Sequence, residues 1–195
     1  MIVIGLTGSI AMGKSTAADM LRRLGLPVFD ADASVHQLTG PSGAALPQLK
    51  QLFPEAVSDA GMDRQKVGAE VFKNPEKKAS LEAILHPRVQ AIQKSWKQQH
   101  RRARRKFVVL DIPLLFETGG ERRCDIVFVI SAPASLQRRR ALARPGMTPQ
   151  KFAGILAAQM PDAQKRRRAD VVIPSGRGKA AMLRSLKAAL RTLAA

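Results

Sequence analysis

The residues with the clearest chemical pattern lie close to the N-terminus. Gly8, four further residues, and then Gly13, Lys14 and Ser15 fit the pattern Gly-x-x-x-x-Gly-Lys-Ser/Thr. In such a loop, backbone N–H groups surround phosphate oxygens, the lysine reaches the terminal phosphates, and the hydroxyl binds Mg²⁺. An apolar run precedes the match and a helical pattern follows it, as this mechanism requires. The sequence therefore predicts a phosphate-binding loop for a nucleoside triphosphate with Mg²⁺.

A pair of carboxylates follows the next apolar run, in the segment Asp30-Ala31-Asp32. Ligands bind at the ends of parallel strands in open α/β sheets, so at least one of the two is expected at the site. An aspartate in this place can also cap the helix that follows, and we assign that role to Asp30. Asp32 is then expected to be the base for an acceptor hydroxyl, and either carboxylate can help to hold Mg²⁺ through water.

Two absences narrow the class of nucleotide-binding protein. The sequence contains no Asn-Lys-x-Asp segment of the kind that reads guanine. None of its apolar runs ends in the Asp-Glu pair that is common in ATPases, where water attacks the phosphate. Both absences favour a kinase, which transfers the phosphoryl group to a small acceptor.

The elements that must position these residues follow from the hydrophobic pattern. Five short runs are continuously apolar, which is typical of parallel strands buried on both faces. Helical patterns lie between them, and this alternation indicates a parallel sheet with right-handed crossovers. We therefore expect an α/β fold of the P-loop type, with three layers and a five-stranded parallel sheet. The expected strands cover residues 2–7, 27–30, 107–112, 125–130 and 170–173, and the clearest helices cover residues 15–24, 134–143 and 178–194.

A long stretch separates the second and third of these strands. Prolines punctuate it, and apolar residues recur between them at helical spacing. Examples are Leu46, Leu49 and Leu52, and Val67, Val71 and Phe72. The prediction is one kinase domain over residues 1–195, with a core of residues 1–30 and 106–195 and a helical insertion of about residues 31–105.

Composition excludes several classes of protein. Lys and Arg number 33 against 15 Asp and Glu, a formal net charge of +18, while 45% of the 195 residues are hydrophobic. The apolar share excludes a disordered basic tail, and the charge favours partners that carry phosphate.

Cys124 is the single cysteine and cannot form an internal disulfide, which suits a reducing compartment. No apolar run reaches the roughly 20 residues that span a bilayer, so we expect a cytoplasmic protein with no membrane partner.

Three basic clusters contribute to the positive charge. The first, residues 101–106, is expected at a helix C-terminus, where the helix dipole favours cations. The clusters at residues 138–140 and 165–168 flank a segment of a chain that handles phosphates, and we expect them to take part in its function.

Short motifs also recur in one order along the chain. They are residues 5–16, Asp30-Ala31-Asp32, Leu85-His86-Pro87, Pro113-Leu114-Leu115-Phe116-Glu117, Gln137 with Arg140 and Arg144, Ala158-Gln159, and Ala169-Asp170-Val171-Val172-Ile173. In this order and spacing they resemble the motifs of the dephospho-coenzyme A (dephospho-CoA) kinase family, from residue 2 to about residue 178. The resemblance implies transfer of the γ-phosphate of ATP to the ribose 3′-hydroxyl of dephospho-CoA, with Mg²⁺, in the last step of coenzyme A synthesis. It also implies that the helical insertion binds the acceptor and that about residues 137–168 form a mobile lid.

The resemblance assigns roles to individual residues. Lys14, Asp32 and Arg140 match catalytic residues, with Asp32 as the base and Arg140 as a lid arginine that neutralises charge on the γ-phosphoryl oxygens. Asp32, His86 and Glu117 match the acceptor site. His86 can instead be structural at a turn before proline, and Glu117 can instead form a cap or pair with an arginine. The residues that match the ATP site are Gly8, Ala11, Met12, Gly13, Lys14, Ser15, Thr16 and Arg144, and Ser15 matches the Mg²⁺ ligand.

The chain departs from the family pattern at a few positions. Ser9 and Ala11 stand where the family often has glycine. If the backbone at Ala11 needs a positive φ, its Cβ costs roughly 1 to 2 kcal/mol. Ser175 lies in the segment that replaces the asparagine common after the last strand, so no adenine contact is carried over there.

Two other functions stay open at this point. A P-loop kinase for another small acceptor, such as a nucleoside or nucleotide, would differ in its acceptor pocket. A P-loop protein that binds nucleic acid would use the net charge to follow a phosphate backbone. Stacking on single strands needs aromatic residues, and this chain is 4% aromatic with one tryptophan. We therefore expect ATP and dephospho-CoA as partners and no specific nucleic acid, and the oligomeric state is left open.

Overall fold

The structure is a computed structural model that describes residues 1–194, and the chain folds as two compact units. The first, which we call the sheet unit, contains residues 1–29 and the chain from residue 103 onward. The second, the helical unit, contains residues 30–102. The expected insertion of about residues 31–105 overlaps this unit and differs from it by one to three residues at the ends, and its acceptor-binding role stays a prediction.

A five-stranded sheet forms the centre of the sheet unit. Its strands are β1 (Ile2–Thr7), β2 (Val28–Asp30), β5 (Phe107–Asp111), β6 (Ile126–Ser131) and β7 (Val171–Pro174), in the spatial order β2-β5-β1-β6-β7. The pairs β1–β5, β1–β6 and β6–β7 are parallel. Continuously apolar strands are what burial on both faces requires. The predicted five-stranded parallel sheet is confirmed, and each strand lies within one residue of its predicted bounds.

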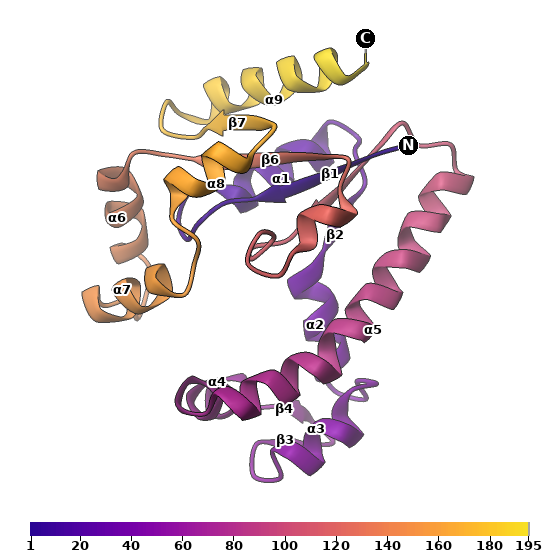
Figure 1. Ribbon diagram of the computed structural model, residues 1–195, viewed down its shortest axis with the longest axis vertical. Coiled ribbons are helices and arrows are strands. Elements are labelled where there is room, and N and C mark those ends of the chain that lie inside the picture. The colour runs from indigo at the N-terminus through magenta and orange to yellow at the C-terminus, as the bar shows by residue number, and fades with distance from the viewer. Residues whose placement is uncertain (195) are drawn as a thin grey trace. The chain divides into compact units, whose positions relative to one another are not determined.

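Helices cover both faces of this sheet. On one face, α1 (Lys14–Arg23) and α9 (Lys179–Ala194) bury residues such as Leu21 and Leu186 against alternate strand residues such as Leu6. On the other face, α8 (Asp162–Arg168) contacts β6. Figure 1 shows α9 and α8 on opposite sides of β7. The three layers expected of a P-loop fold are therefore present.

Further helices lie before and after β6 in the sequence. A short 3₁₀ helix, η1 (Gly120–Arg123), precedes it, and α6 (Ala134–Leu142) and α7 (Pro149–Ala157) follow it. Thr148 caps α7, because its Oγ1 accepts the N–H of Lys151 at 3.2 Å. Helices α6 and α7 lie beyond the end of the sheet in Figure 1. The expected lid of about residues 137–168 contains α7 and the larger part of α6, and its mobility stays a prediction.

The helical unit has its own hydrophobic core. Its elements are α2 (Ala31–Thr39), α3 (Leu46–Leu52), α4 (Arg64–Lys73), α5 (Pro75–Arg102) and an antiparallel pair, β3 (Val57–Ser58) with β4 (Gly61–Met62). The predicted apolar residues Leu46, Leu49 and Val67 are buried in this core. Phe72 is not, since 85% of it is exposed. Five residues from Val67 correspond to about 140° around a helix, which places Phe72 on a different face.

Pro87 lies inside α5, so the alternative that His86 stands at a turn is wrong. Proline removes one helical hydrogen bond and disfavours helical backbone in the residue before it. Leu85 on one side and Val89 on the other both pack against the core of the helical unit. This packing on both sides of Pro87 keeps the helix continuous.

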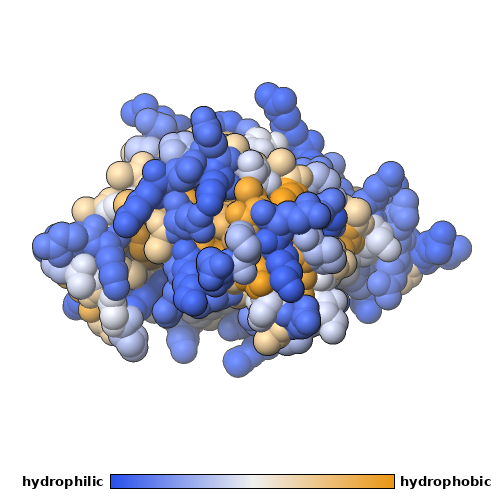
Figure 2. Space-filling model, turned by 90° about the horizontal axis from the view of Figure 1, so that it is seen from below, coloured by the Kyte–Doolittle hydropathy of each residue, from blue (hydrophilic) through white to orange (hydrophobic). Residues whose placement is uncertain are grey.

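The face of the molecule in Figure 2 is strongly hydrophilic. In Figure 2, long hydrophilic side chains project around a smaller group of apolar residues, as expected of a chain with 33 Lys and Arg. Helices long and apolar enough to cross a bilayer are absent from residues 1–194.

Candidate active site

The predicted phosphate-binding loop joins β1 directly to α1. Gly13 precedes the helix with a φ of 96°, a left-handed conformation that glycine adopts at little cost. Lys14 is the first residue of α1, and Ser15 is exposed in its first turn. Because the first N–H groups of a helix have no partner within the helix, this end of α1 favours a bound phosphate.

Ala11 lies in the same loop and also has a positive φ, of 61°. The backbone at Ala11 therefore has the positive φ considered in the sequence analysis. This left-handed conformation costs an alanine roughly 1 to 2 kcal/mol. The Ala11 side chain is buried in a small apolar cluster with Ala141 of α6 and Phe152 of α7. This packing opposes the cost of the strained backbone and holds the loop in its turn.

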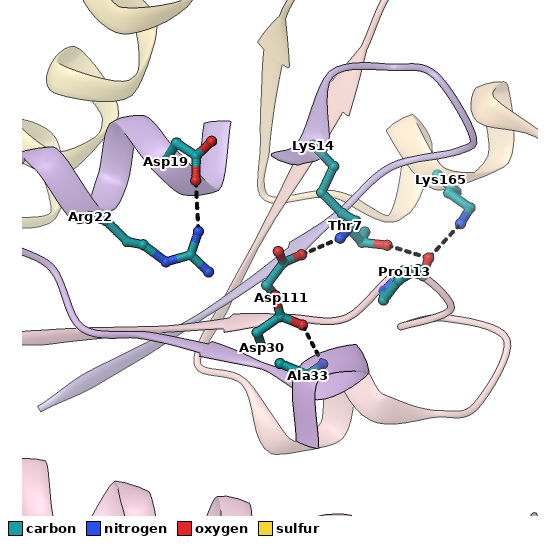
Figure 3. Close-up of polar contacts among 9 residues, drawn as sticks. All are labelled: Thr7, Lys14, Asp19, Arg22, Asp30, Ala33, Asp111, Pro113 and Lys165. Carbon is teal, nitrogen blue, oxygen red and sulfur yellow. Dashed lines mark hydrogen bonds and ion pairs between the residues drawn. The ribbon is translucent and has the colours of Figure 1, made fainter. Parts of the chain in front are cut away.

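A buried carboxylate lies beside the loop. The Nζ atom of Lys14 forms an ion pair with Oδ1 of Asp111, the last residue of β5 (Figure 3). The topology explains the pairing, because β5 neighbours β1 and Asp111 is in register with Leu6 near the end of β1. The side chains of Lys14 and Asp111 are only 16% and 6% exposed, so water screens their attraction poorly.

The segment after Asp111 is held in place by polar contacts. Thr7 Oγ1 donates a hydrogen bond to the carbonyl oxygen of Pro113 at 3.0 Å, and Lys165 Nζ donates to the same oxygen at 3.4 Å (Figure 3). Lys165 is fully buried, unlike its neighbours at positions 166–168, which are exposed. Lys165 is thus a structural cation in the sheet unit, whereas we expected it to handle phosphates together with its basic neighbours.

Glu117 is the ion-pair partner of Lys165, at 2.8 Å. Its Oε1 also accepts the N–H of Met160 at 2.8 Å. Burial raises the pKa of Glu117, but the hydrogen bond and charge of Lys165 and the Met160 N–H outweigh it, so the pKa lies below its ordinary value. Glu117 therefore forms an ion pair, with Lys165 in place of the arginine considered from the sequence, and its role toward the acceptor stays a prediction.

Arg140 of α6 joins the segment after β7 to the loop. Its Nη1 donates to Ser175 Oγ at 3.2 Å and its Nη2 donates to the Ser175 carbonyl at 3.0 Å. The Ser175 hydroxyl in turn donates to the carbonyl oxygen of Met12. Ser175 therefore anchors Arg140 beside the loop. Arg144 lies exposed just after the same helix.

The remaining predicted residues belong to the helical unit. Asp30 caps α2 as predicted, since its Oδ1 accepts the N–H of Ala33 at 3.0 Å (Figure 3). Asp32 lies exposed in the first turn of α2, which leaves its carboxylate open to solvent. His86 is exposed on α5.

The residues present fit a magnesium ion that is held mainly by substrate phosphates. Ser15 offers an exposed hydroxyl and Asp111 a carboxylate at the adjoining strand end. Within residues 1–194, no group of three or more His, Cys, Asp or Glu is arranged to hold a metal. Phosphate oxygens and water would complete the shell, as Mg²⁺ prefers. Ser9 Oγ is buried in the loop without a hydrogen-bond partner, and a bound phosphate can satisfy it.

Comparison with known proteins identifies the family. A family model described as dephospho-CoA kinase matches residues 2–179. The chain belongs to the dephospho-CoA kinase family. The dephospho-CoA kinase of Paramagnetospirillum magneticum is 58% identical over 166 residues, which are 85% of this chain and 78% of that protein. The dephospho-CoA kinase of Agrobacterium fabrum is 48% identical over the whole of both chains.

Solved structures share the fold of this chain. A Thermus thermophilus crystal structure is 39% identical, with a TM-score of 0.85 over 98% of this chain and 97% of that chain. A shikimate kinase from Acinetobacter baumannii is 18% identical, with a TM-score of 0.51 over 100% of this chain and 94% of its own, and shares the fold alone. The family model and the curated relatives confirm the dephospho-CoA kinase family predicted from the short motifs.

Two residues beside the phosphate-binding loop, Asp111 and Ser175, were not predicted from the sequence as site residues. Asp111 continues an apolar run, and its only signal was a lone carboxylate near the end of a predicted strand. Ser175 lies in the segment that replaces the asparagine common after the last strand, so no role was carried over to it from the family. Its contacts with Arg140 and Met12 depend on the neighbouring placement of β6 and β7.

Proposed function

We infer that this chain transfers the γ-phosphoryl group of ATP to the ribose 3′-hydroxyl of dephospho-CoA, giving CoA and ADP in the last step of coenzyme A biosynthesis. The observation that carries this conclusion is the ion pair of Lys14 with Asp111 beside a phosphate-binding loop, in a chain that matches the family over residues 2–179. The buried carboxylate fixes the lysine at the start of α1, where the terminal phosphates of ATP are expected.

In the proposed reaction, the acceptor O3′ forms a bond to the γ-phosphorus, and the bond from that phosphorus to the β–γ bridging oxygen breaks. The proton of the 3′-hydroxyl passes to the carboxylate of Asp32, whose exposure leaves it open to an acceptor. Lys14 and Arg140 place positive charge against the phosphoryl oxygens as charge shifts toward ADP. Backbone N–H groups of residues 8–15 bind the phosphates and hold them in line with the acceptor.

We propose that Ser15 and Asp111 hold Mg²⁺, with Asp30 or Asp32 able to contribute through water. When bound, the ion neutralises phosphate charge and makes the γ-phosphorus more electrophilic. The net charge of +18 complements the phosphates of ATP and dephospho-CoA, which we propose as partners in the cytoplasm.

The experiment that tests this function measures ADP formation from Mg-ATP. Dephospho-CoA is compared as acceptor with a panel of nucleosides, nucleotides and pantothenate-like alcohols, and each reaction is run beside a control without acceptor. We expect turnover that depends on dephospho-CoA, with CoA as the product identified by mass. Turnover with another acceptor of the panel, and not with dephospho-CoA, would show a kinase that acts on a different acceptor. No acceptor-dependent turnover at all would contradict a kinase.

A further inference from the structure

Two glutamine side chains hold the tip of the phosphate-binding loop. The N–H of Ile10 donates to Oε1 of Gln159 at 2.9 Å, and the carbonyl oxygen of Ile10 accepts from Nε2 of Gln137 at 2.9 Å. Gln137 lies on α6 and Gln159 follows α7, so the two contacts reach one loop residue from separate elements. Both main-chain polar groups of Ile10 are therefore satisfied by side chains more than 120 residues away in sequence.

The polarity of this arrangement is fixed by the backbone. A main-chain N–H can only donate and a main-chain carbonyl can only accept, so Gln159 must present its oxygen and Gln137 its nitrogen. Gln137 is 6% exposed, and an amide buried to that degree is costly to leave without a partner. The two glutamines consequently act as a donor and an acceptor that cannot exchange roles.

The next two loop residues are also held from outside the loop. Ala11, with its left-handed backbone, packs against Ala141 and Phe152, and the Met12 carbonyl accepts from Ser175. The apolar cluster also includes Ile10. Residues 10–12 are thus fixed in a strained turn by contacts from the 134–160 segment and the strand end beyond it.

We propose that Gln137 and Gln159 are positioning residues that clamp Ile10 and set the affinity of the phosphate-binding loop for ATP. The proposal rests on the proposed kinase function and adds to it a physical link between the expected lid segment and the loop. Because the clamp shapes the loop before the phosphates arrive, its loss weakens ATP binding and leaves the transfer step almost unchanged at saturating ATP.

The test uses paired substitutions in the full-length chain. Gln159→Glu keeps an acceptor for the Ile10 N–H, whereas Gln137→Glu removes the donor to the Ile10 carbonyl. Both substitutions add one negative charge to the same region. A difference between their Kd values for Mg-ATP therefore reports whether the donor or the acceptor of the clamp was lost. Gln150, which is exposed on α7, provides the matched control as Gln150→Ala. The Kd for Mg-ATP is measured by calorimetry, alongside kcat and both KM values.

We expect Gln137→Glu and Gln159→Ala to raise the Kd for ATP about 5- to 30-fold, as for a buried hydrogen bond that is lost. Gln159→Glu should bind ATP more tightly than Gln137→Glu, with kcat and the KM for dephospho-CoA close to wild type in all three. Equal Kd values for wild type and all variants would overturn the proposal, as would a loss of kcat at unchanged Kd.

Amide exchange at Ile10 tests the clamp without any turnover. We expect slow exchange of the Ile10 N–H in the nucleotide-free wild type and in Gln150→Ala, and fast exchange in Gln159→Ala. Fast exchange in the wild type would overturn the clamp. Protection at Ile10 in a protein that neither binds nor uses ATP would leave the clamp in place and instead contradict the kinase function. If Gln137→Glu does not fold, the half-buried Gln159 carries the test.

Discussion

The Lys14 ammonium meets the Asp111 carboxylate where the neighbouring strands β1 and β5 end. This contact ties the first residue of α1 to the sheet and compensates a charge that would otherwise be buried alone. It also gives the site a fixed cation and a carboxylate within reach of one another. Phosphoryl transfer requires such a cation for the phosphates and a carboxylate for the metal.

Replacing Lys14 by Ala should lower kcat/KM for ATP by about 100-fold or more, because a fixed charge on the phosphoryl oxygens is lost. Steady-state kinetics measures the effect, and circular dichroism tests whether the fold is kept. Lys187→Ala, an exposed lysine on α9, is the matched control and should behave as wild type. Near-normal activity of a folded Lys14→Ala protein would remove Lys14 from the mechanism.

Replacing Asp111 by Asn keeps the shape of the side chain and removes its charge. We expect the Mg²⁺ concentration for half-maximal rate to rise about tenfold, since a metal ligand or its water partner is weakened. A titration of activity with Mg²⁺ at fixed ATP measures this. An unchanged Mg²⁺ dependence would restrict Asp111 to orienting Lys14.

Asp32→Asn should lower kcat by about 100-fold or more while KM changes little, because a general base contributes to the transition state and not to binding. Asp59→Asn, at another exposed aspartate of the helical unit, serves as the control. A kcat close to wild type would end the assignment of Asp32 as the base.

The sheet could be predicted from sequence because its signals are local. The strands are continuous apolar runs, and the phosphate-binding loop has fixed glycine and lysine positions between a strand and a helix. The cap at Asp30 follows from one side chain and the residues directly after it. Each of these features depends on a few consecutive residues, so each can be read without knowing the fold.

The polar contacts behind the loop could not be predicted in the same way. Asp111 lies 97 residues from Lys14, and Gln159 lies 149 residues from Ile10. These contacts form only because of the order of the strands in the sheet and the packing of the helices that follow them. Neither is visible in a few consecutive residues. Lys165 shows the same limit, because its basic neighbours suggested a shared role toward phosphates, while the fold buries it against Glu117.

Arg140→Ala should lower kcat/KM strongly, by about 100-fold, since it removes a guanidinium that is held beside the phosphate-binding loop by two hydrogen bonds to Ser175. Arg138→Ala provides the control, because Arg138 is exposed on the same helix. Arg140→Lys keeps the charge but cannot reproduce the two-pronged contact, so it should recover only part of the activity. Wild-type kinetics for both Arg138→Ala and Arg140→Ala would remove Arg140 from the mechanism and leave it only its contacts with Ser175.

Glu117→Gln should destabilise the protein by about 2 to 3 kcal/mol at neutral pH, because it leaves the fully buried Lys165 without its counter-charge. The pKa of Glu117 is lowered in the folded state, so its ionised form stabilises the fold above the ordinary pKa of 4.5. That contribution is lost as the pH falls through the lowered pKa. The difference in unfolding free energy between wild type and Glu117→Gln should therefore be largest near pH 7 and shrink below about pH 4.5. Urea unfolding at several pH values measures it, with the exposed Glu55→Gln as control. A difference that stays constant down to acid pH would show that the charge of Glu117 does not support the fold.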